Sequence, residues 1–173
     1  MQVQIQPLSS NHNCKGFDCG TLPLNEWLAT MARQQQKKNI ARTFVLVDVA
    51  APETVLGYYT LAVSEVCHED FPNPKKFPER VPVVRLGRFA TLKTLQRKGL
   101  GGQLLLNALE KVGELSLNAG IAAIVVDAKD TDAATYYAQY GFLPSPENPL
   151  RLFLLTATLQ EAIAQAAGDP GAL

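Results

Sequence analysis

Apolar residues recur along the chain with two different periods, which predict strands alternating with helices. Short apolar or alternating runs predict strands at 2–5, 43–49, 55–66, 81–92, 121–127 and 151–159, with a turn at 50–54. Apolar residues three or four positions apart predict helices at 21–39, 100–118 and 131–140, and a short helix at 160–166. The predicted order is therefore β-α-β-β-β-α-β-α-β, followed by the short helix.

Local signals mark the ends of these helices and their buried faces. Thr21 can cap the first helix, and Pro23 lies in its first turn. Asp130 can cap the third helix, and Gly141 closes it. The apolar stripe of the second helix consists of Leu104, Leu105, Ala108, Val112 and Leu115.

The order of the elements predicts the kind of sheet. The strand at 121–127 is apolar almost throughout, as expected for a strand covered on both faces. The strand, helix and strand from 81 to 126 should form a crossover, so this part of the sheet should be parallel. A chain of 173 residues suits one domain, 1–173, with a core over about 2–160 and a frayed tail from about 167. We therefore expect an α/β fold with a central mixed sheet flanked by helices.

The composition favours a soluble, cytoplasmic protein with no contact to a membrane. The hydrophobic fraction of 47% and the charged fraction of 18% are typical of globular domains, and no apolar run is long enough for a membrane span. The N-terminus lacks the features of a signal peptide. Cys14 and Cys19 with His12 are candidate metal ligands, but no second ligand pair follows at a zinc-like spacing, so we expect no metal.

The net charge of zero hides an uneven distribution of basic residues. Four basic residues and no acid lie between Trp27 and Val47, and eight basic residues against one acid lie between Asn73 and Lys98. A locally basic face on a neutral protein favours an anionic ligand at one place. A solvated surface with scattered basic side chains explains the charge equally well.

A glycine-rich turn, QRKGLGG at 96–102, joins a predicted strand to a predicted helix. Helix N-termini offer backbone N–H groups and partial positive charge, and glycines let a phosphate approach closely. Arg97 and Lys98 add positive charge, so the turn can hold a pyrophosphate; tight packing of helix on sheet is the alternative. The spacing matches neither a Walker loop nor a dinucleotide fingerprint.

The same turn, with Gln96, Gly99 and Gly101 in place, resembles the Gln/Arg-x-x-Gly-x-Gly/Ala signature of the Gcn5-related N-acetyltransferases (GNAT). AATYYAQYGF at 133–142 resembles the late helix of that family. The resemblance covers about 2–160 and implies the GNAT fold. Further segments resemble the branch of acetyltransferase toxins: FDCGTLPLNEWL, RTFVLVD, VLGYYTLA, VVRLGRFATL and YYAQYGFLPSPENPLRLFL. The resemblance to this branch implies a toxin that acetylates the amino group of aminoacyl-tRNA and blocks translation.

The resemblance also implies acetyl-coenzyme A as the acetyl donor. It places the pantetheine arm along the strand at 81–92, where Gly87 leaves room for the thioester, and the pyrophosphate in the loop. In this loop Arg97 stands where the family commonly has glycine. The residues assigned to the coenzyme are Phe89, Ala90, Leu92, Gln96, Arg97, Lys98, Gly99, Leu100, Gly101 and Gly102.

Tyr137 occupies the position of the family's tyrosine, whose hydroxyl can protonate the departing thiolate. A tyrosine with a pKa near ~10 stays protonated at pH 7. Tyr136 and Tyr140 fall on another helical face, and we expect them to pack. No general base is assigned, because the amine of an aminoacyl ester is already partly neutral at pH 7. Glu65, His68 and Glu69 are candidates for that role.

The resemblance implies charged tRNA as the acceptor, a ribbon-helix-helix antitoxin, a homodimer, and contact with DNA through the antitoxin complex. Basic side chains that contact phosphates position a nucleic acid without reading its sequence. Two alternatives stay open: acetylation of a protein or small amine, and an inactive binding module with the same fold. The candidate tRNA-binding residues are Arg33, Lys37, Lys38, Arg42, Arg85 and Arg88.

Overall fold

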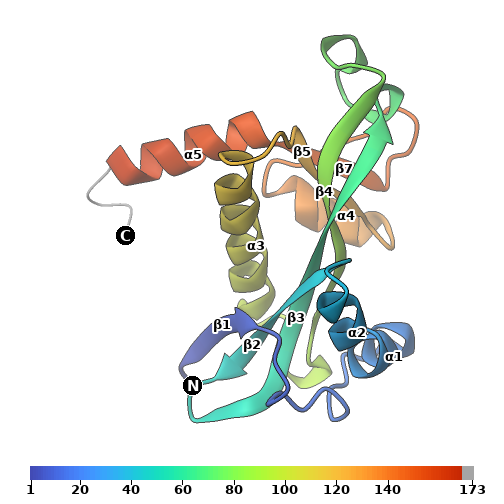
Figure 1. Ribbon diagram of the computed structural model, residues 1–173. Helices are drawn as coiled ribbons and strands as arrows, with labels where there is room; N and C mark the ends of the chain where they lie inside the picture. Colours follow the sequence, from blue (N-terminus) through green and yellow to red (C-terminus); the bar gives the residue numbers. More distant parts are fainter. Residues whose placement is uncertain (169–173) are drawn as a thin grey trace. The chain divides into compact units, whose positions relative to one another are not determined.

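A computed structural model describes residues 1–168, and Figure 1 shows its elements. The α-helices are α1 (Leu22–Thr30), α2 (Ala32–Lys37), α3 (Leu100–Ser116), α4 (Thr131–Ala138) and α5 (Thr156–Gly168). The short 3-10 helices are η1 (His68–Asp70), η2 (Pro74–Lys76) and η3 (Lys93–Leu95). The strands are β1 (Val3–Pro7), β2 (Arg42–Asp48), β3 (Ala51–Cys67), β4 (Arg80–Thr91), β5 (Ala123–Asp127), β6 (Leu143–Pro144) and β7 (Arg151–Leu155). The part of the predicted frayed tail at 169–173 lies outside the described residues.

Within residues 1–168 the strands form one mixed sheet in the order β1-β2-β3-β4-β5-β7-β6. β4 and β5 are parallel and are connected through α3, as predicted for a crossover. β1 with β2, β2 with β3, β5 with β7, and β6 with β7 are antiparallel pairs. The predicted α/β fold with a mixed sheet is therefore confirmed.

The chain divides into two compact units, each built from two stretches of sequence. We call residues 1–62 with 87–108 the N-terminal unit, and residues 63–86 with the chain from 109 onward the C-terminal unit. β3, β4 and α3 contribute residues to both units.

One buried cluster of the N-terminal unit lies on the α1 side of β3 and β4. Tyr58 is fully buried there, stacks with Trp27, and donates a hydrogen bond to the carbonyl oxygen of Leu24 over 2.8 Å. α1 and α2 lie side by side (Figure 1). Because strand residues alternate between faces, Tyr59 points the other way, and its hydroxyl donates to Asn107 of α3 over 2.6 Å. The sheet of this unit therefore has an α1 face and an α3 face.

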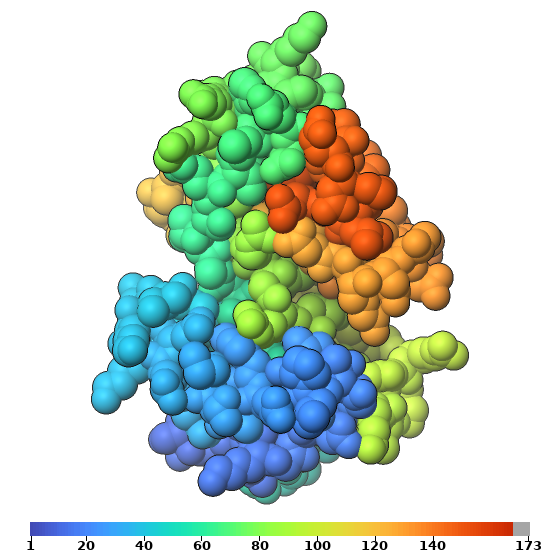
Figure 2. All heavy atoms as spheres, turned by 90° about the vertical axis from the view of Figure 1, so that its right-hand side faces the viewer, coloured from blue at the N-terminus to red at the C-terminus, as the bar shows by residue number. Residues whose placement is uncertain are grey.

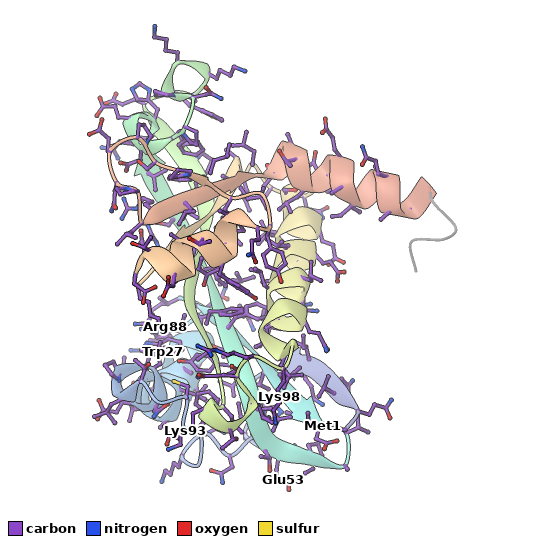
Figure 3. All side chains as sticks on the ribbon, turned by 180° about the vertical axis from the view of Figure 1, so that it is seen from behind. Met1, Trp27, Glu53, Arg88, Lys93 and Lys98 are labelled. Carbon is purple, nitrogen blue, oxygen red and sulfur yellow. The ribbon has the colours of Figure 1, made fainter. Side chains whose placement is uncertain are left out.

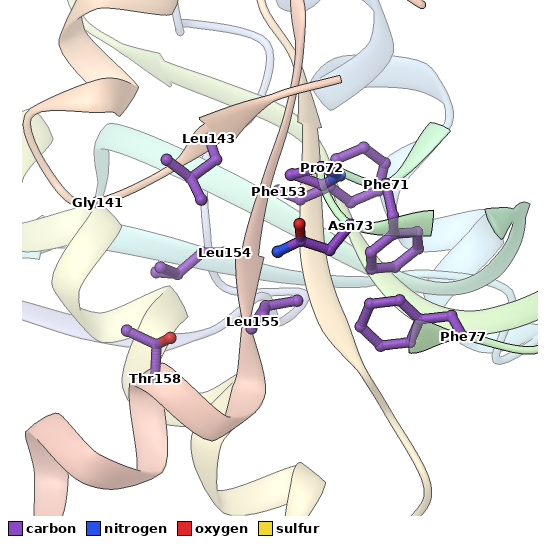
Figure 4. A pocket seen from close by; sticks show the side chains of 10 residues that line it. All are labelled: Phe71, Pro72, Asn73, Phe77, Gly141, Leu143, Phe153, Leu154, Leu155 and Thr158. Carbon is purple, nitrogen blue, oxygen red and sulfur yellow. The ribbon is translucent and has the colours of Figure 1, made fainter. Parts of the chain in front are cut away.

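One buried cluster of the C-terminal unit contains aromatic rings around Phe71 together with valines of the strands. The rings of Phe77 and Phe153 each lie 4.5 Å from the Phe71 ring, measured between centroids. A pocket opens beside this cluster (Figure 4), and its polar side chains are Asn73 and Thr158. No charged side chain is among the residues that line it, so this pocket offers no acid, base or ion pair for catalysis.

The helix predicted at 21–39 is interrupted at Met31, which separates α1 from α2. The hydroxyl of Thr30 donates to the carbonyl oxygen of Glu26 over 2.7 Å, a side-chain bond that tends to bend helices. Pro23 lies in the first turn as predicted, but Thr21 makes no side-chain capping bond with any described residue. Asp130 caps α4 as predicted, accepting from the N–H of Ala133 over 2.8 Å.

Two strand boundaries also differ from the prediction. The predicted turn at 50–54 lies mostly within β3, which starts at Ala51. The last long strand ends at Leu155 and α5 begins at Thr156, whose hydroxyl donates to the carbonyl oxygen of Ile121. The alanine-rich sequence that follows favours a helix over a strand. In α3, Leu115 is 40% exposed, whereas the other predicted members of the stripe are fully buried.

Two mid-strand glycines have opposite surroundings, which predicts opposite effects of a methyl group. A Cβ on Gly57 would lie 2.8 Å from Leu104 Cδ1 and 3.0 Å from the backbone oxygen of Ala90, but one on Gly87 would meet no described heavy atom within 4 Å. We expect Gly57→Ala to lower the free energy of unfolding by about 1–3 kcal/mol through overpacking. Gly87→Ala, the matched control, should leave it unchanged or slightly higher. Urea unfolding measures both; equal losses in the two variants would contradict the packing described for α3.

Candidate functional site

The glycine-rich turn lies between β4 and α3 in the N-terminal unit. Residues 96–99 are exposed, and this part of the chain projects from the surface in Figure 2. The backbone has a positive φ at Arg97 (63°) and again at Gly99 (83°), and α3 starts at Leu100. Glycine adopts this conformation without strain, whereas a side chain such as that of arginine makes it costly. The turn therefore has a backbone conformation that favours glycine at both position 97 and position 99, but position 97 is an arginine.

This turn has the properties of an anion site. The first N–H groups of an α-helix have no acceptor within the helix, and they carry the positive end of its dipole. The first helical bond of α3 runs from the N–H of Gln103 to the carbonyl oxygen of Gly99. A Cβ on Gly99 would meet no described atom within 4 Å, so the space beside it is open. Lys98 lies at the start of α3 (Figure 3). The residues present therefore fit a pyrophosphate group.

Gln96 and Lys93 tie the turn to the segment before α1. The Gln96 side chain donates to the carbonyl oxygens of Cys19, over 2.9 Å, and Thr91, over 3.4 Å. Lys93 forms an ion pair with Asp18, with 2.6 Å between Nζ and Oδ2. This bond, with further bonds from Gly20 and Asn25, lowers the pKa of the Asp18 carboxyl to about 2. Gln96 thus holds the loop in place through its side chain, a role that the sequence did not indicate.

β4 continues beyond its parallel partner. The ladder with β5 runs from Val83 to Arg85, whereas β4 extends to Thr91. Past Arg85 the β5-facing edge of β4 therefore offers backbone N–H and C=O groups, as an added extended ligand would need. Of the residues assigned to the coenzyme here, Ala90 is buried and Phe89 and Leu92 are half-buried. The open space beside Gly87 fits the prediction that this glycine leaves room.

Tyr137 lies on α4 in the C-terminal unit and is 7% exposed. Its ring contacts Tyr136 edge-on, with centroids 5.6 Å apart, and Phe142 at 5.7 Å. Burial raises the pKa of Tyr137 to about 12. Tyr136 and Tyr140 pack against each other with centroids 5.4 Å apart, and both remain half-buried. Tyr137 is thus the most buried of the three, and its hydroxyl stays protonated at neutral pH.

Asp127 organises the end of β5 from which α4 starts. Its carboxylate accepts from Arg151 over 2.8 Å and from Arg85, and Arg151 also reaches Asp70 over 3.3 Å. Hydrogen bonding to Asp127 raises the pKa of Arg151. Arg85, predicted to bind tRNA, therefore has its charge largely balanced within the protein. Nothing in the sequence indicated that Arg85 pairs with Asp127, which lies three positions before the α4 cap at Asp130.

The candidate bases are engaged in local contacts. Glu65 forms an ion pair with Arg80 over 3.3 Å, and His68 Nδ1 lies 3.2 Å from the carbonyl oxygen of Phe77. A carbonyl oxygen accepts, so this ring nitrogen donates. The Oε1 atom of Glu69 lies 4.0 Å from Nε2 of His68. None of these contacts indicates that Glu65, His68 or Glu69 acts as a general base.

The other predicted tRNA residues lie in the N-terminal unit. Arg33 donates to the carbonyl oxygens of Ser9, over 3.2 Å, and His12. Arg42 donates to Asn39 over 3.2 Å, and the exposed Lys37 and Lys38 end α2. Arg33 and Lys37 thus lie on α2, which Lys38 ends, and Arg42 begins β2. Arg88 lies on β4, and Arg85 belongs to the other unit.

His12 serves as a hydrogen-bonding side chain. Its Nδ1 accepts from the N–H of Ser9 over 3.0 Å, so Nε2 donates to Gln6 over 3.2 Å. Burial lowers its pKa and raises that of Cys14. Within residues 1–168, no three His, Cys, Asp or Glu side chains are grouped to hold a metal ion. None of the helices in this part combines the length and apolar character needed to cross a membrane.

Known proteins resemble this chain over most of its length. A tRNA-acetylating toxin of Mycobacterium tuberculosis is 31% identical over 150 residues, covering 86% of this chain and 89% of the toxin. A solved structure of a KacT mutant has a TM-score of 0.87 at 30% identity, covering 94% of this chain and 99% of KacT. AtaT complexed with acetyl-methionyl-tRNAfMet has a TM-score of 0.86 at 32% identity, with the same coverage. AtaT has also been solved with acetyl-CoA and the C-terminus of its antitoxin AtaR, and its complex with AtaR has been solved bound to DNA.

The family match confirms the resemblance seen in the loop and the late helix. The model of the acetyltransferase (GNAT) family matches residues 15–142, which include the glycine-rich turn and Tyr137. Two of the relatives above are toxins by name or act with an antitoxin. With the mixed sheet, the crossover and the loop in place, the chain belongs to the GNAT family of acetyltransferases and is an N-acetyltransferase.

Proposed function

We propose that this N-acetyltransferase is the toxin of a toxin–antitoxin pair and acetylates the amino group of aminoacyl-tRNA, which blocks translation. The observation that carries the proposal is its similarity, over 86% and 94% of the chain, to a tRNA-acetylating toxin and to AtaT in complex with acetyl-methionyl-tRNAfMet. The alternative acceptor is a protein or small-molecule amine. An inactive binding module is disfavoured, because the loop and the buried tyrosine are both present.

The donor in this proposal is acetyl-CoA, which AtaT binds in a solved structure. When bound, it supplies an acetyl group activated as a thioester. Residues 96–102 would hold its pyrophosphate through the N-terminus of α3, with Arg97 and Lys98 adding positive charge. The edge of β4 from Gly87 to Leu92 would hold the pantetheine arm through backbone hydrogen bonds.

Tyr137 would act as the general acid. The α-amino group of an amino acid has a pKa near ~8, so a useful fraction is neutral at pH 7 without a dedicated base. The departing thiolate needs a proton, and Tyr137 still carries its own at that pH because burial raises its pKa to about 12. Asp130 and the Asp127 network hold the start of the helix that carries it.

The partners belong to the same proposal. Arg33, Lys37, Lys38, Arg42 and Arg88 would contact tRNA phosphates, with a smaller part for Arg85 because Asp127 balances its charge. An antitoxin of the ribbon-helix-helix type would bind the toxin, and their complex would contact DNA. We also propose that the protein is a homodimer and that each chain is a single N-acetyltransferase domain. It would act in the cytoplasm, where translation occurs.

A transfer assay tests the function and the acid together. Purified protein is mixed with acetyl-CoA labelled in the acetyl group and a pool of charged tRNA. We expect label on the amino acid of charged tRNA, none on uncharged tRNA, and a loss of about 10²–10⁴-fold in kcat for Tyr137→Phe. Tyr140→Phe, which keeps Tyr137, is the matched control and should stay within a few-fold of wild type. Label on protein or small amines instead of tRNA would move the acceptor to the alternative class.

The raised pKa of Tyr137 predicts how the protein titrates. The protonated form persists below the pKa, so Tyr137 should stay un-ionised from about pH 9 to pH 11, where an ordinary tyrosine ionises. Wild type and Tyr137→Phe should then gain the same phenolate absorbance over this range. An additional phenolate in the wild type would show that Tyr137 has an ordinary pKa.

A substitution at Arg97 should affect the stability of the loop and its affinity for the coenzyme in opposite directions. Arg97→Gly should raise the free energy of unfolding by ~1 kcal/mol, because glycine adopts the φ of 63° without strain. It should also weaken acetyl-CoA binding several-fold, because a cation is lost. Gly99→Ala is the converse change and should be destabilising at a φ of 83° despite the open space beside it. Thermal unfolding and calorimetric titration measure the two effects; a destabilised Arg97→Gly protein would contradict the strain.

A further inference from the structure

Arg88 lies over the ring of Trp27 in the N-terminal unit. Its guanidinium carbon is 4.3 Å from the centroid of the Trp27 ring, and the two side chains are adjacent in Figure 3. Trp27 is 8% exposed and stacks on the buried Tyr58 with 8° between the planes. Phe17 supports Tyr58 from its edge, with centroids 5.4 Å apart. The surface under the guanidinium is therefore rigid.

The donors of Arg88 remain available for a ligand. Five of the chain's arginines donate to acceptors in the protein: Arg33, Arg42, Arg80, Arg85 and Arg151. Within residues 1–168, Arg88 and Arg97 form no such hydrogen bond or ion pair. Arg97 is exposed in the loop, whereas Arg88 is half-buried on Trp27.

The contact with Trp27 leaves the N–H groups of Arg88 without an acceptor among the described residues. A guanidinium carries five N–H groups at its edges, and contact through its face uses none of them. No buried side-chain nitrogen or oxygen of the described chain lacks a partner, so the Arg88 nitrogens are not sealed away from solvent. Trp27 thus holds in place a guanidinium whose donors can match two oxygens of a phosphate.

The face on which Arg88 lies favours one source of phosphate. Arg88 contacts Trp27, and Ala90, two positions on, packs in the same cluster, so both point to the α1 face. The loop assigned to the coenzyme pyrophosphate instead leads into α3, which packs on the opposite face through Tyr59, and it has its own cations. α2, which contacts α1, carries Arg33 and Lys37 and ends at Lys38. An acceptor that reaches the edge of β4 from the α1 face would pass Arg88.

We propose that Arg88 binds a phosphodiester in the 3′ end of the acceptor tRNA and that Trp27 is the positioning residue that holds it. The proposal rests on the proposed function and names the contact nearest the amino acid, because Arg88 adjoins Gly87 on the strand assigned to the donor. The chemistry is recognition of a phosphate; the phosphates of the coenzyme are the other source, and the experiment separates the two.

The test compares steady-state acetylation of charged tRNA by wild type, Arg88→Ala, Trp27→Leu and the double variant, with Arg80→Ala as the control on the same strand. We expect about a tenfold rise in KM for tRNA with Arg88→Ala, and no change in KM for acetyl-CoA. The slope of log(kcat/KM) against log salt should fall by about 0.7–0.9, the value for one phosphate contact. The double variant should be no worse than Arg88→Ala, because both changes remove one contact.

Trp27 is a core residue, so Trp27→Phe and Arg88→Lys keep the proposal testable if Trp27→Leu does not fold. Arg88→Lys keeps the charge without the planar fork, and should raise the KM for tRNA while leaving the salt slope unchanged. Trp27→Phe should raise the KM for tRNA less than Arg88→Ala does.

Three results would overturn the proposal in distinguishable ways. A rise in the KM for acetyl-CoA, with an unchanged KM for tRNA, would assign Arg88 to the coenzyme. Unchanged kinetics for Arg88→Ala on charged tRNA would leave the proposed function standing and remove Arg88 from the contact. A wild-type protein that binds acetyl-CoA but labels no charged tRNA would remove the proposed function, and this contact with it.

Discussion

The parallel ladder between β4 and β5 ends at Arg85 and Val125, and the candidate donor site begins on β4 where that ladder ends. A strand that has lost its neighbour has backbone groups to offer on that edge. From there to Thr91, β4 carries the open space at Gly87 and the stacked Arg88, and then leads into the glycine-rich turn. Continued pairing with β5 would occupy the edge that we propose for the donor.

The turn itself is held by contacts distant in sequence. Gln96 bonds the carbonyl oxygen of Cys19, 77 positions earlier, and Lys93 pairs with Asp18. These bonds fix where the loop leaves β4, while positive φ angles at Arg97 and Gly99 turn it into the N-terminus of α3. A loop held in this way can bind an anion with little loss of conformational entropy, because its backbone is already ordered.

Much of the fold was predictable because it depends on local pattern. The crossover at 81–126, the Asp130 cap and the glycine-rich turn follow from periodicity and from the conformations that single residue types allow. What could not be read depends on which side chains meet across the fold. Gly57 and Gly87 look alike as mid-strand glycines, yet packing against Leu104 makes them opposites. The Trp27–Arg88 stack has no sequence signal, and the roles of Tyr137 and the coenzyme residues stay predictions.

The most direct measurement of the central claim is mass spectrometry of the amino acids released from tRNA after the protein is expressed in bacterial cells. We expect N-acetylated amino acids on tRNA from cells with the wild-type protein and none from cells with Tyr137→Phe. If the wild-type protein stops growth while the tRNA of the cells carries only unmodified amino acids, the acceptor is not aminoacyl-tRNA.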